Sequence, residues 1–212
     1  MAESMTYNSL LADVAMYAER NDRPFIDQMP RFVMLAENRI ASQTRGLGLL
    51  KIVTGAFEPG QDVVAKPARW RETGTFMVRD EEASATFLKS RSYTFCRSFA
   101  PNASSTGLPQ YYADYGYEYF LVAAKPDQAY NFELAYFERP LPLDETTQTN
   151  WTTQYAPQLL LYATLLEAQP FLKLDQRATE FKGLYDLARQ DLLEESQRRL
   201  FGDQALLRSD AK

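Results

Sequence analysis

Apolar residues recur at helical spacing near both ends of this chain but not in its middle, and this change of pattern limits the folds open to it. Residues 7–18, 32–40 and 181–192 each carry apolar side chains three or four positions apart, as on one face of an amphipathic helix. Between residues 47 and 146, glycine and proline recur, and β-branched or aromatic residues replace the helical period. We therefore predict an α+β fold in which helices from both ends flank a β-rich middle.

Local signals mark the first two helices. Thr6 is a suitable N-cap for the first helix, and the sequence from Asn21 to Pro24 interrupts the apolar pattern after it. Pro30 suits the first turn of the second helix, which we expect to end at Gly46 and Gly48.

Two more helices are predicted near the C-terminus. Residues 159–166 are apolar almost all round, which indicates a helix at the centre of a bundle. Gln169 and Pro170 are expected to break this helix. The next helix is expected from about residue 176 to 200, ending at Gly202.

The clearest strands lie in the second half of the β-rich middle. Residues 110–115 and 117–124 are predicted strands divided by Gly116. Residues 130–137 alternate between apolar and polar side chains, which is the period of a half-buried strand.

The first half of the middle gives weaker signals. Residues 63–65, 68–70 and 75–78 are predicted to form a hairpin with an edge strand, with a turn at Thr73-Gly74. A short helix is expected near residues 90–98, where the apolar residues fit neither period cleanly.

The simplest architecture for this order of elements is one helical bundle with a β-rich insert. Helices at the two chain ends must bury their apolar faces, and the simplest partner for each is the other. We predict that residues 1–46 and 147–200 form the bundle, that residues 47–146 form the inserted module, and that residues 201–212 form a C-terminal arm.

The chain contains no histidine and a single cysteine, Cys96. The missing histidine excludes Ser/His/Asp and Cys/His catalysis and removes the commonest metal ligand. One cysteine allows neither a disulfide within the chain nor a thiolate cluster, and the apolar neighbours of Cys96 favour a buried, inert thiol. Carboxylate, lysine or tyrosine chemistry stays open on this ground alone, but we expect no catalytic, cofactor or metal site.

Adjacent acidic residues are the remaining candidates for acid/base chemistry. They occur at residues 80–82, 144–145 and 194–195. Each group falls in a predicted turn or on a predicted solvent-facing helix surface, so we interpret all three as solvated charge runs.

The formal net charge of −5 is concentrated in residues 101–150, which contain two basic and seven acidic side chains. Tight binding to a phosphate backbone needs clustered Lys and Arg, which are missing here, so DNA is expected to pass without specific binding. Aromatic residues between Tyr111 and Phe120 could stack bases, but their neighbours Asp114 and Glu118 are acidic. Strand packing or contact with a neighbouring subunit is the favoured interpretation.

Neither end of the chain indicates a membrane protein. The longest apolar run is residues 159–166, far below the roughly 18 to 20 residues that span a bilayer. The N-terminus has neither a basic cluster nor a hydrophobic stretch, so we expect no signal peptide and a cytoplasmic origin.

At the C-terminal end, Leu206, Leu207 and Arg208 belong either to a frayed terminus or to an arm that orders on a partner. They are the candidate partner-binding residues.

Six segments follow one another along the chain: YNSLLADVAMYAERND, FIDQMPRFVMLAENRI, RSYTFCRSFAPN, GLPQYYADYG, YNFELAYFERPLPL and TNWTTQYAPQLLLYATLLEAQPFL. Together they resemble the head-to-tail adaptor, or connector, proteins that lie below the portal of tailed bacteriophages. The resemblance covers nearly the whole chain. No single segment is diagnostic, so its specificity comes from the ordered combination.

This resemblance implies a non-enzymatic structural role in the virion neck. Such adaptors assemble from about twelve copies through the cyclic contacts of a closed ring. The ring docks on the portal protein, extends the DNA channel and offers a platform to a tail, nozzle or stopper protein. By this resemblance the helical part forms the ring wall, residues 201–212 reach toward the portal, and the protein is made in the host bacterial cytoplasm.

Two other functions stay open at this point. The chain could be a different neck or tail component, such as a stopper or a tail terminator. It could also be a carboxylate-dependent, tail-associated glycan hydrolase, which would need two acidic side chains facing each other across a cleft.

Overall fold

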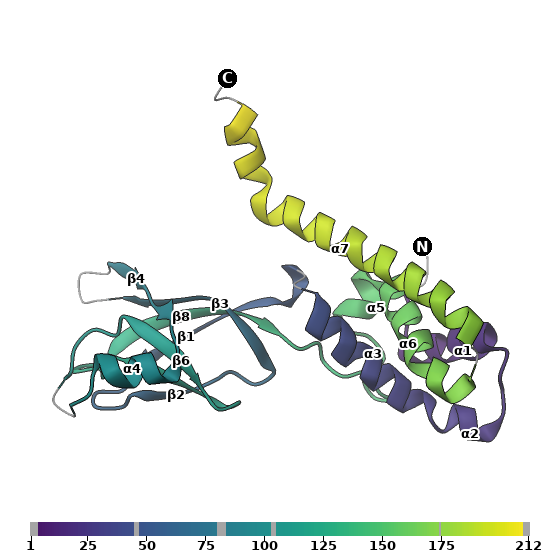
Figure 1. Cartoon of the computed structure of the whole chain (residues 1–212), viewed down its shortest axis with the longest axis horizontal. Coiled ribbons are helices and arrows are strands. Elements are labelled where there is room, and N and C mark those ends of the chain that lie inside the picture. Colours follow the sequence, from purple (N-terminus) through teal and green to yellow (C-terminus); the bar gives the residue numbers. More distant parts are fainter. Residues whose placement is uncertain (1–3, 45–46, 80–83, 103–104, 174, 210–212) are drawn as a thin grey trace. The chain divides into compact units, whose positions relative to one another are not determined.

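The computed structural model describes residues 4–44, 47–79, 84–102, 105–173 and 175–209, without the side chains of residues 47, 175–176 and 200–209. The chain divides into two compact units, shown in Figure 1. Residues 1–49 and 139–212 form the helical unit, and residues 50–138 form the β unit, which also contains a helix. The protein therefore combines helices and sheets, as the predicted α+β class requires.

Seven described helical segments build the helical unit. They are α1 (Tyr7–Ala18), α2 (Arg23–Ile26), α3 (Met29–Gln43), the 3-10 helix η1 (Leu47–Leu49), α5 (Trp151–Tyr155), α6 (Pro157–Leu172) and α7 (Asp175–Ser209). The predicted cap of α1 is confirmed, because the Thr6 hydroxyl accepts a hydrogen bond from the Ser9 N–H at 3.1 Å. The helix α3 ends at Gln43, earlier than predicted, and Thr44 is its C-cap.

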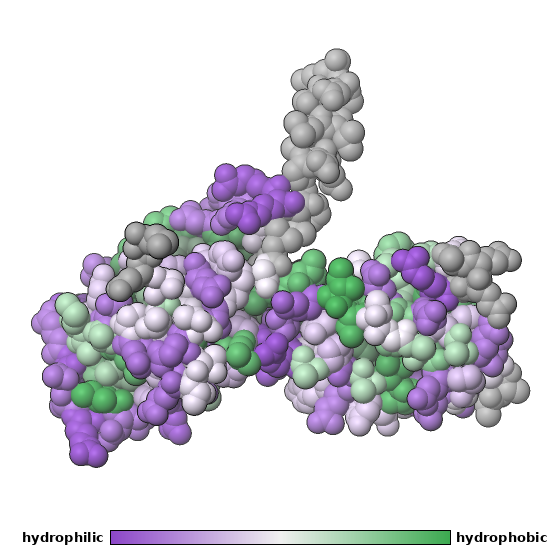
Figure 2. All heavy atoms as spheres, turned by 180° about the vertical axis from the view of Figure 1, so that it is seen from behind, coloured by the Kyte–Doolittle hydropathy of each residue, from purple (hydrophilic) through white to green (hydrophobic). Residues whose placement is uncertain are grey.

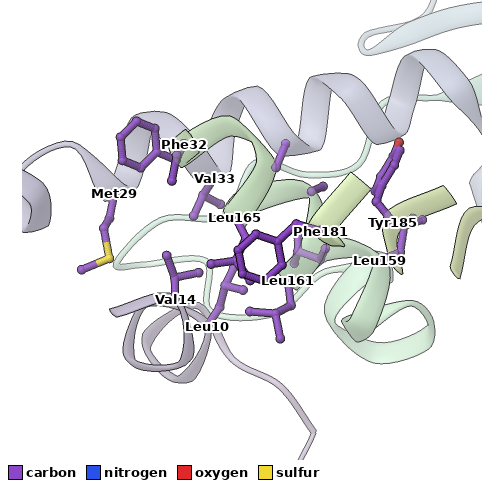
Figure 3. Close-up of a cluster of buried hydrophobic side chains, with 14 of the residues drawn as sticks. Leu10, Val14, Met29, Phe32, Val33, Leu159, Leu161, Leu165, Phe181 and Tyr185 are labelled. Atoms are coloured by element: carbon purple, nitrogen blue, oxygen red, sulfur yellow. The ribbon is translucent and has the colours of Figure 1, made fainter. Parts of the chain in front are cut away.

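Helices from both ends of the chain share one hydrophobic core. Figure 3 shows side chains from α1, α3, α6 and α7 in this cluster, among them Leu10, Val33, Leu165 and Phe181. The helix α6 packs against α1, α3, α5 and α7, which explains why it is apolar on all sides. Burying one such Leu or Phe side chain contributes roughly 1.5–3 kcal/mol, so this shared core is the main force that holds the helices together.

Two predicted helix ends are wrong. The helix α6 continues through Pro170 to Leu172 and ends where Lys173 adopts a left-handed conformation, with φ 55°. Pro170 is exposed and lies in the last turn, so it removes one backbone hydrogen bond near the end of the helix without ending it. The helix α7 continues through Gly202 to Ser209, since a single glycine costs a helix only about 1 kcal/mol relative to alanine.

The β unit contains eight described strands and one described helix. They are β1 (Leu50–Phe57), β2 (Val63–Ala65), β3 (Trp70–Arg79), β4 (Ala85–Phe87), β5 (Lys89–Ser90), α4 (Tyr93–Phe99), β6 (Tyr111–Tyr115), β7 (Tyr119–Ala123) and β8 (Tyr130–Glu138). One sheet has the order β1-β8-β3-β4, and the other has the order β2-β7-β6-β5. Phe57 and Phe76 of the first sheet share an aromatic core with Phe120 of the second.

The strand predictions for the second half of the β unit are confirmed. The strands β6 and β7 pair as an antiparallel hairpin around Gly116, whose φ of 70° suits glycine in a tight turn. In β8, Tyr130, Leu134 and Tyr136 are buried, while Asn131 between them is exposed. The alternating pattern therefore marks the correct strand and its buried face.

The predicted hairpin between residues 63 and 78 is wrong. The strand β2 pairs with β7, whereas β3 pairs with β8 and β4, so the two strands lie in different sheets. Thr73 and Gly74 lie inside β3, where the register against β8 shifts. A Cβ on Gly74 would lie 3.2 Å from the carbonyl oxygen of Ala135, so this glycine serves a close approach between strands and not a turn.

Candidate interaction surfaces

The adjacent acidic residues do not form a reactive site in the described structure. Asp144 is exposed and accepts hydrogen bonds from the Thr146 hydroxyl and from the Thr146 and Thr147 N–H groups, which lower the pKa of its carboxyl group. Glu194 and Glu195 are exposed on α7. Residues 80–82 lie outside the described residues. Within the described part of the chain, no cluster of three His, Cys, Asp or Glu side chains is placed to hold a metal ion.

The described helices include none that is both long enough and apolar enough to cross a membrane. Hydrophilic side chains gather instead over α7, where Figure 2 shows a purple region beside the grey atoms.

The hairpin tip, Tyr115 to Tyr119, is the first candidate interaction surface. Tyr117 is 94 % exposed at its apex, and Tyr115 and Tyr119 are the last pair of the β6–β7 ladder. Glu118 is exposed beside Tyr117, and it makes no ion pair within the described part of the chain. The tip thus presents tyrosine rings and hydroxyl groups together with a carboxylate.

Lys66 holds this hairpin close to its tip. Its side chain is only 3 % exposed, and its ammonium group donates to Asp114 Oδ1 at 2.6 Å and to the Gly116 carbonyl oxygen at 3.2 Å. The same ammonium lies 3.8 Å from the centre of the Trp70 ring and 4.9 Å from that of Phe120. These cation–π and ionic contacts restrain the hairpin, so its tip is offered as a preformed shape.

An exposed aromatic face surrounds α4. Tyr93 stacks on Tyr115 with ring centres 5.9 Å apart, and Phe95 packs edge-on against Tyr111 at 5.1 Å. The Arg97 guanidinium lies 5.4 Å from the Tyr93 ring and donates to its hydroxyl oxygen at 3.2 Å. Exposed tyrosine and arginine side chains of this kind are enriched at the centres of protein interfaces. This face is an extension of the hairpin tip, because Tyr115 belongs to both.

A groove between α3, α6 and α7 is the second candidate surface. Its volume is about 1050 Å³, and its charged lining consists of Arg39, Lys173, Lys182 and Arg189 against Asp186. Arg39 donates to Glu167 at 2.5 Å, and Lys182 donates to Asp186 at 2.8 Å. Arg189 is a second ionic partner of Asp186 at 3.9 Å, so the four cations are balanced by only two carboxylates, and the groove keeps an excess of positive charge that attracts acidic partners.

Two polar atoms of the groove have no hydrogen-bond partner. Gln169 is 7 % exposed, and its Nε2 donates to the Leu165 carbonyl oxygen at 3.2 Å, but its Oε1 accepts nothing. The Nε–H of Arg189 is also buried without a hydrogen-bond acceptor, although Asp186 Oδ1 is its ionic partner at 3.9 Å. Leaving a buried polar group unpaired costs roughly 1–3 kcal/mol, so the groove presents one acceptor and one donor that a partner could satisfy.

Glu37 is a buried carboxyl group that joins α3 to the segment before α5. It is 7 % exposed, accepts from Asn150 Nδ2 at 2.8 Å, and lies 3.3 Å from the Leu143 N–H. Burial raises the pKa of this carboxyl group to about 7, although both hydrogen bonds act in the opposite direction. The group is structural, and it stabilises the return of the chain from the β unit to the helices.

The residues singled out from sequence have different outcomes. Leu206, Leu207 and Arg208 lie within the range of α7, but their side chains are outside the described residues. Cys96 is buried as predicted, and burial raises the pKa of its thiol. Gly48 is not merely a helix terminator, because a Cβ at this position would lie 1.6 Å from Trp151 Nε1.

Sequence reasoning missed the basic groove entirely. Lys182, Asp186 and Arg189 follow one another at helical spacing, which could have indicated one charged face. Arg39 and Gln169 come from other helices, and nothing local connects them to that face.

A family model described as SU10 adaptor protein matches residues 5–208. No curated protein matches the chain. The matched range includes the hairpin tip, the aromatic face, the basic groove and residues 206–208.

Proposed function

Because this chain belongs to the SU10 adaptor protein family, a structural family of phage adaptors and not of enzymes, we propose that it is the head-to-tail adaptor in the neck of a tailed phage. Copies of it form a ring below the portal protein, extend the DNA channel and provide the platform for a tail, nozzle or stopper protein. The family match over residues 5–208 is the observation on which the proposal rests.

The surfaces of the protein support an assembly role. A ring requires contacts in which one patch of each copy meets a different patch of the next copy. The hairpin tip carries tyrosines and a carboxylate, whereas the groove is basic, so one chain offers two patches of opposite character. The aromatic face around α4 adds exposed apolar area of the kind that interfaces use.

The charge distribution supports a channel role without specific DNA binding. Residues 101–150 carry the whole net charge of −5. Acidic side chains facing a channel repel the phosphate backbone, so DNA moves past the wall without sticking to it.

The remaining parts of the proposal concern the arrangement of the subunit. The N- and C-terminal helices act as one bundle that forms the ring wall, and residues 201–212 act as an arm toward the portal. Leu206, Leu207 and Arg208 are the proposed contact residues of that arm, with two apolar side chains for burial and one cation for an acidic partner.

Family membership also bears on the alternatives. A glycan hydrolase is set aside, since the family is structural and not enzymatic. A stopper or a tail terminator would occupy a different level of the neck, so the position of the protein relative to the portal separates these roles from the adaptor role.

The test is electron microscopy of particles from a phage in which the gene is deleted, with a plasmid copy as the control. We expect DNA-filled heads that lack tails, and tailed particles when the plasmid copy is expressed. Cryo-electron microscopy of complemented virions should then place the chain in direct contact with the portal. Tailed, infectious particles without the gene would overturn the proposal, and so would a position that does not touch the portal.

A further inference from the structure

We propose that the hairpin tip of one copy inserts into the basic groove of a neighbouring copy, with Tyr117 and Glu118 as the inserted residues and Arg39, Gln169, Lys182 and Arg189 as the receiving ones. The inference rests on the proposed ring, because it names the contact between adjacent subunits. It explains why one chain carries both an exposed acidic tip and a basic groove.

The groove specifies the chemistry of its occupant. Gln169 Oε1 is a buried acceptor without a donor, whereas Arg189 Nε makes no hydrogen bond but has Asp186 Oδ1 as an ionic partner at 3.9 Å. The occupant must therefore bring a hydroxyl or amide donor for Gln169, together with a group that suits a lining with more cations than carboxylates. With a volume of about 1050 Å³, the groove is slightly larger than the roughly 300–1,000 Å³ of small-molecule sites, which suits a loop of polypeptide.

The hairpin tip matches this requirement. The Tyr117 hydroxyl is a donor for Gln169 Oε1, and the Glu118 carboxylate is an acceptor for Arg189 and for the ammonium group of Lys182. Tyr117 is 94 % exposed, so its insertion breaks no packing within its own subunit. The contacts of Lys66 with Asp114 and Trp70 fix the hairpin next to its tip, so the tip loses little conformational entropy on docking.

A second copy is the occupant that the charges favour. The hairpin carries Asp114 and Glu118 and no basic side chain, whereas the lining of the groove has more cations than carboxylates. Tip and groove are different patches, so their contact is heterologous, and repeating it gives a ring when the rotation from copy to copy closes, as the proposed function requires.

Cysteine cross-linking between two separately purified proteins tests the contact. One carries Tyr117→Cys and the other Lys182→Cys, and the native Cys96 is buried and does not interfere. The proteins are mixed, assembled on purified portal and oxidised, and each protein alone serves as a control. We expect disulfide-linked pairs in the mixture at a level at least tenfold above either protein alone.

Four outcomes have separate meanings. Linked pairs in a ring support the inference. A ring without linked pairs overturns the inference and leaves the proposed function standing. Failure of the parent chain to assemble on portal, again without linked pairs, overturns both. Linkage of Lys182→Cys to a portal cysteine, and not to Tyr117→Cys, identifies the portal as the occupant and overturns the choice of a second copy.

Charge exchange provides an independent readout on the full-length chain. Glu118→Lys and Lys182→Glu alter exposed side chains, so both variants should keep the parent circular dichroism spectrum. In sedimentation experiments, each variant alone should form at least tenfold less assembled ring than the parent. The two changes combined in one chain should restore the amount of ring to within about threefold of the parent. Weakening without restoration, or no weakening at all, would count against the contact.

Discussion

Glu37 Oε1 accepts a hydrogen bond from Asn150 Nδ2 at 2.8 Å, and this buried pair joins α3 to the N-cap of α5. The Asn150 Oδ1 atom accepts from the Thr152 and Thr153 N–H groups, so one side chain caps α5 and contacts α3 at the same time. The pair holds the chain where it re-enters the helical unit. Its carboxyl group also links folding to pH.

Replacing Glu37 by glutamine should remove a pH dependence of stability. The pKa of Glu37 is about 7 in the folded protein against 4.5 as its ordinary value, so the folded state holds more protons between these values. The contribution of Glu37 to the free energy of unfolding is greatest below pH 4.5 and falls as the pH rises from 4.5 to 7. Above pH 7 this contribution is lower by about 3 kcal/mol. Urea unfolding should therefore show Glu37→Gln gaining stability over the parent by up to about 3 kcal/mol at pH 8, and by much less at pH 5.

The exposed Glu145 provides the matched control for that experiment. Glu145→Gln should leave the difference between pH 5 and pH 8 unchanged. An equal gain at both pH values for Glu37→Gln would show that the charge of Glu37 is not the cause.

Gly48→Ala should destabilise the helical unit. The added Cβ would lie 1.6 Å from Trp151 Nε1, so the indole ring must move from its packed position, at a cost of roughly 1–3 kcal/mol. Gly183→Ala is the control, because nothing lies within 4 Å of its Cβ position on α7, and a helical alanine should stabilise by roughly 0.5–1 kcal/mol. Thermal unfolding followed by circular dichroism should separate the two variants in opposite directions, and similar melting temperatures would contradict the packing argument.

Lys66→Met should loosen the hairpin tip. The methionine keeps most of the buried volume but loses the ion pair with Asp114 and the contact with the Trp70 ring, together worth roughly 1–2 kcal/mol. Hydrogen exchange measured by mass spectrometry should become faster in residues 111–123. The exposed Lys89→Met should leave that exchange unchanged, and equal protection in both variants would show that Lys66 does not restrain the hairpin.

Deleting residues 203–212 should weaken portal binding while leaving the fold intact. The proposed arm supplies Leu206, Leu207 and Arg208, and losing this contact should lower the affinity for portal at least tenfold, which corresponds to about 1.4 kcal/mol. Deleting only residues 209–212 keeps these three residues and serves as the control. Surface plasmon resonance on immobilised portal measures both, and equal affinities would exclude the arm.

Much of the local structure could be predicted from the sequence because its cause is local. The hydroxyl of Thr6 caps the helix that starts beside it, and the alternation along residues 130–137 defines one buried face of β8. The hairpin around Gly116 follows from a residue that tolerates positive φ between two strand patterns.

Partner choice was decided only by the tertiary structure, because it depends on groups that are distant in sequence. The sequence around Thr73 and Gly74 does not indicate that β3 pairs with β8 and not with β2, because a glycine in a bulge and a glycine in a turn give the same local signal. The basic groove requires Arg39, Gln169 and Arg189 to meet from three helices. Periodicity states which face of a helix is buried, but only packing in three dimensions states which faces meet.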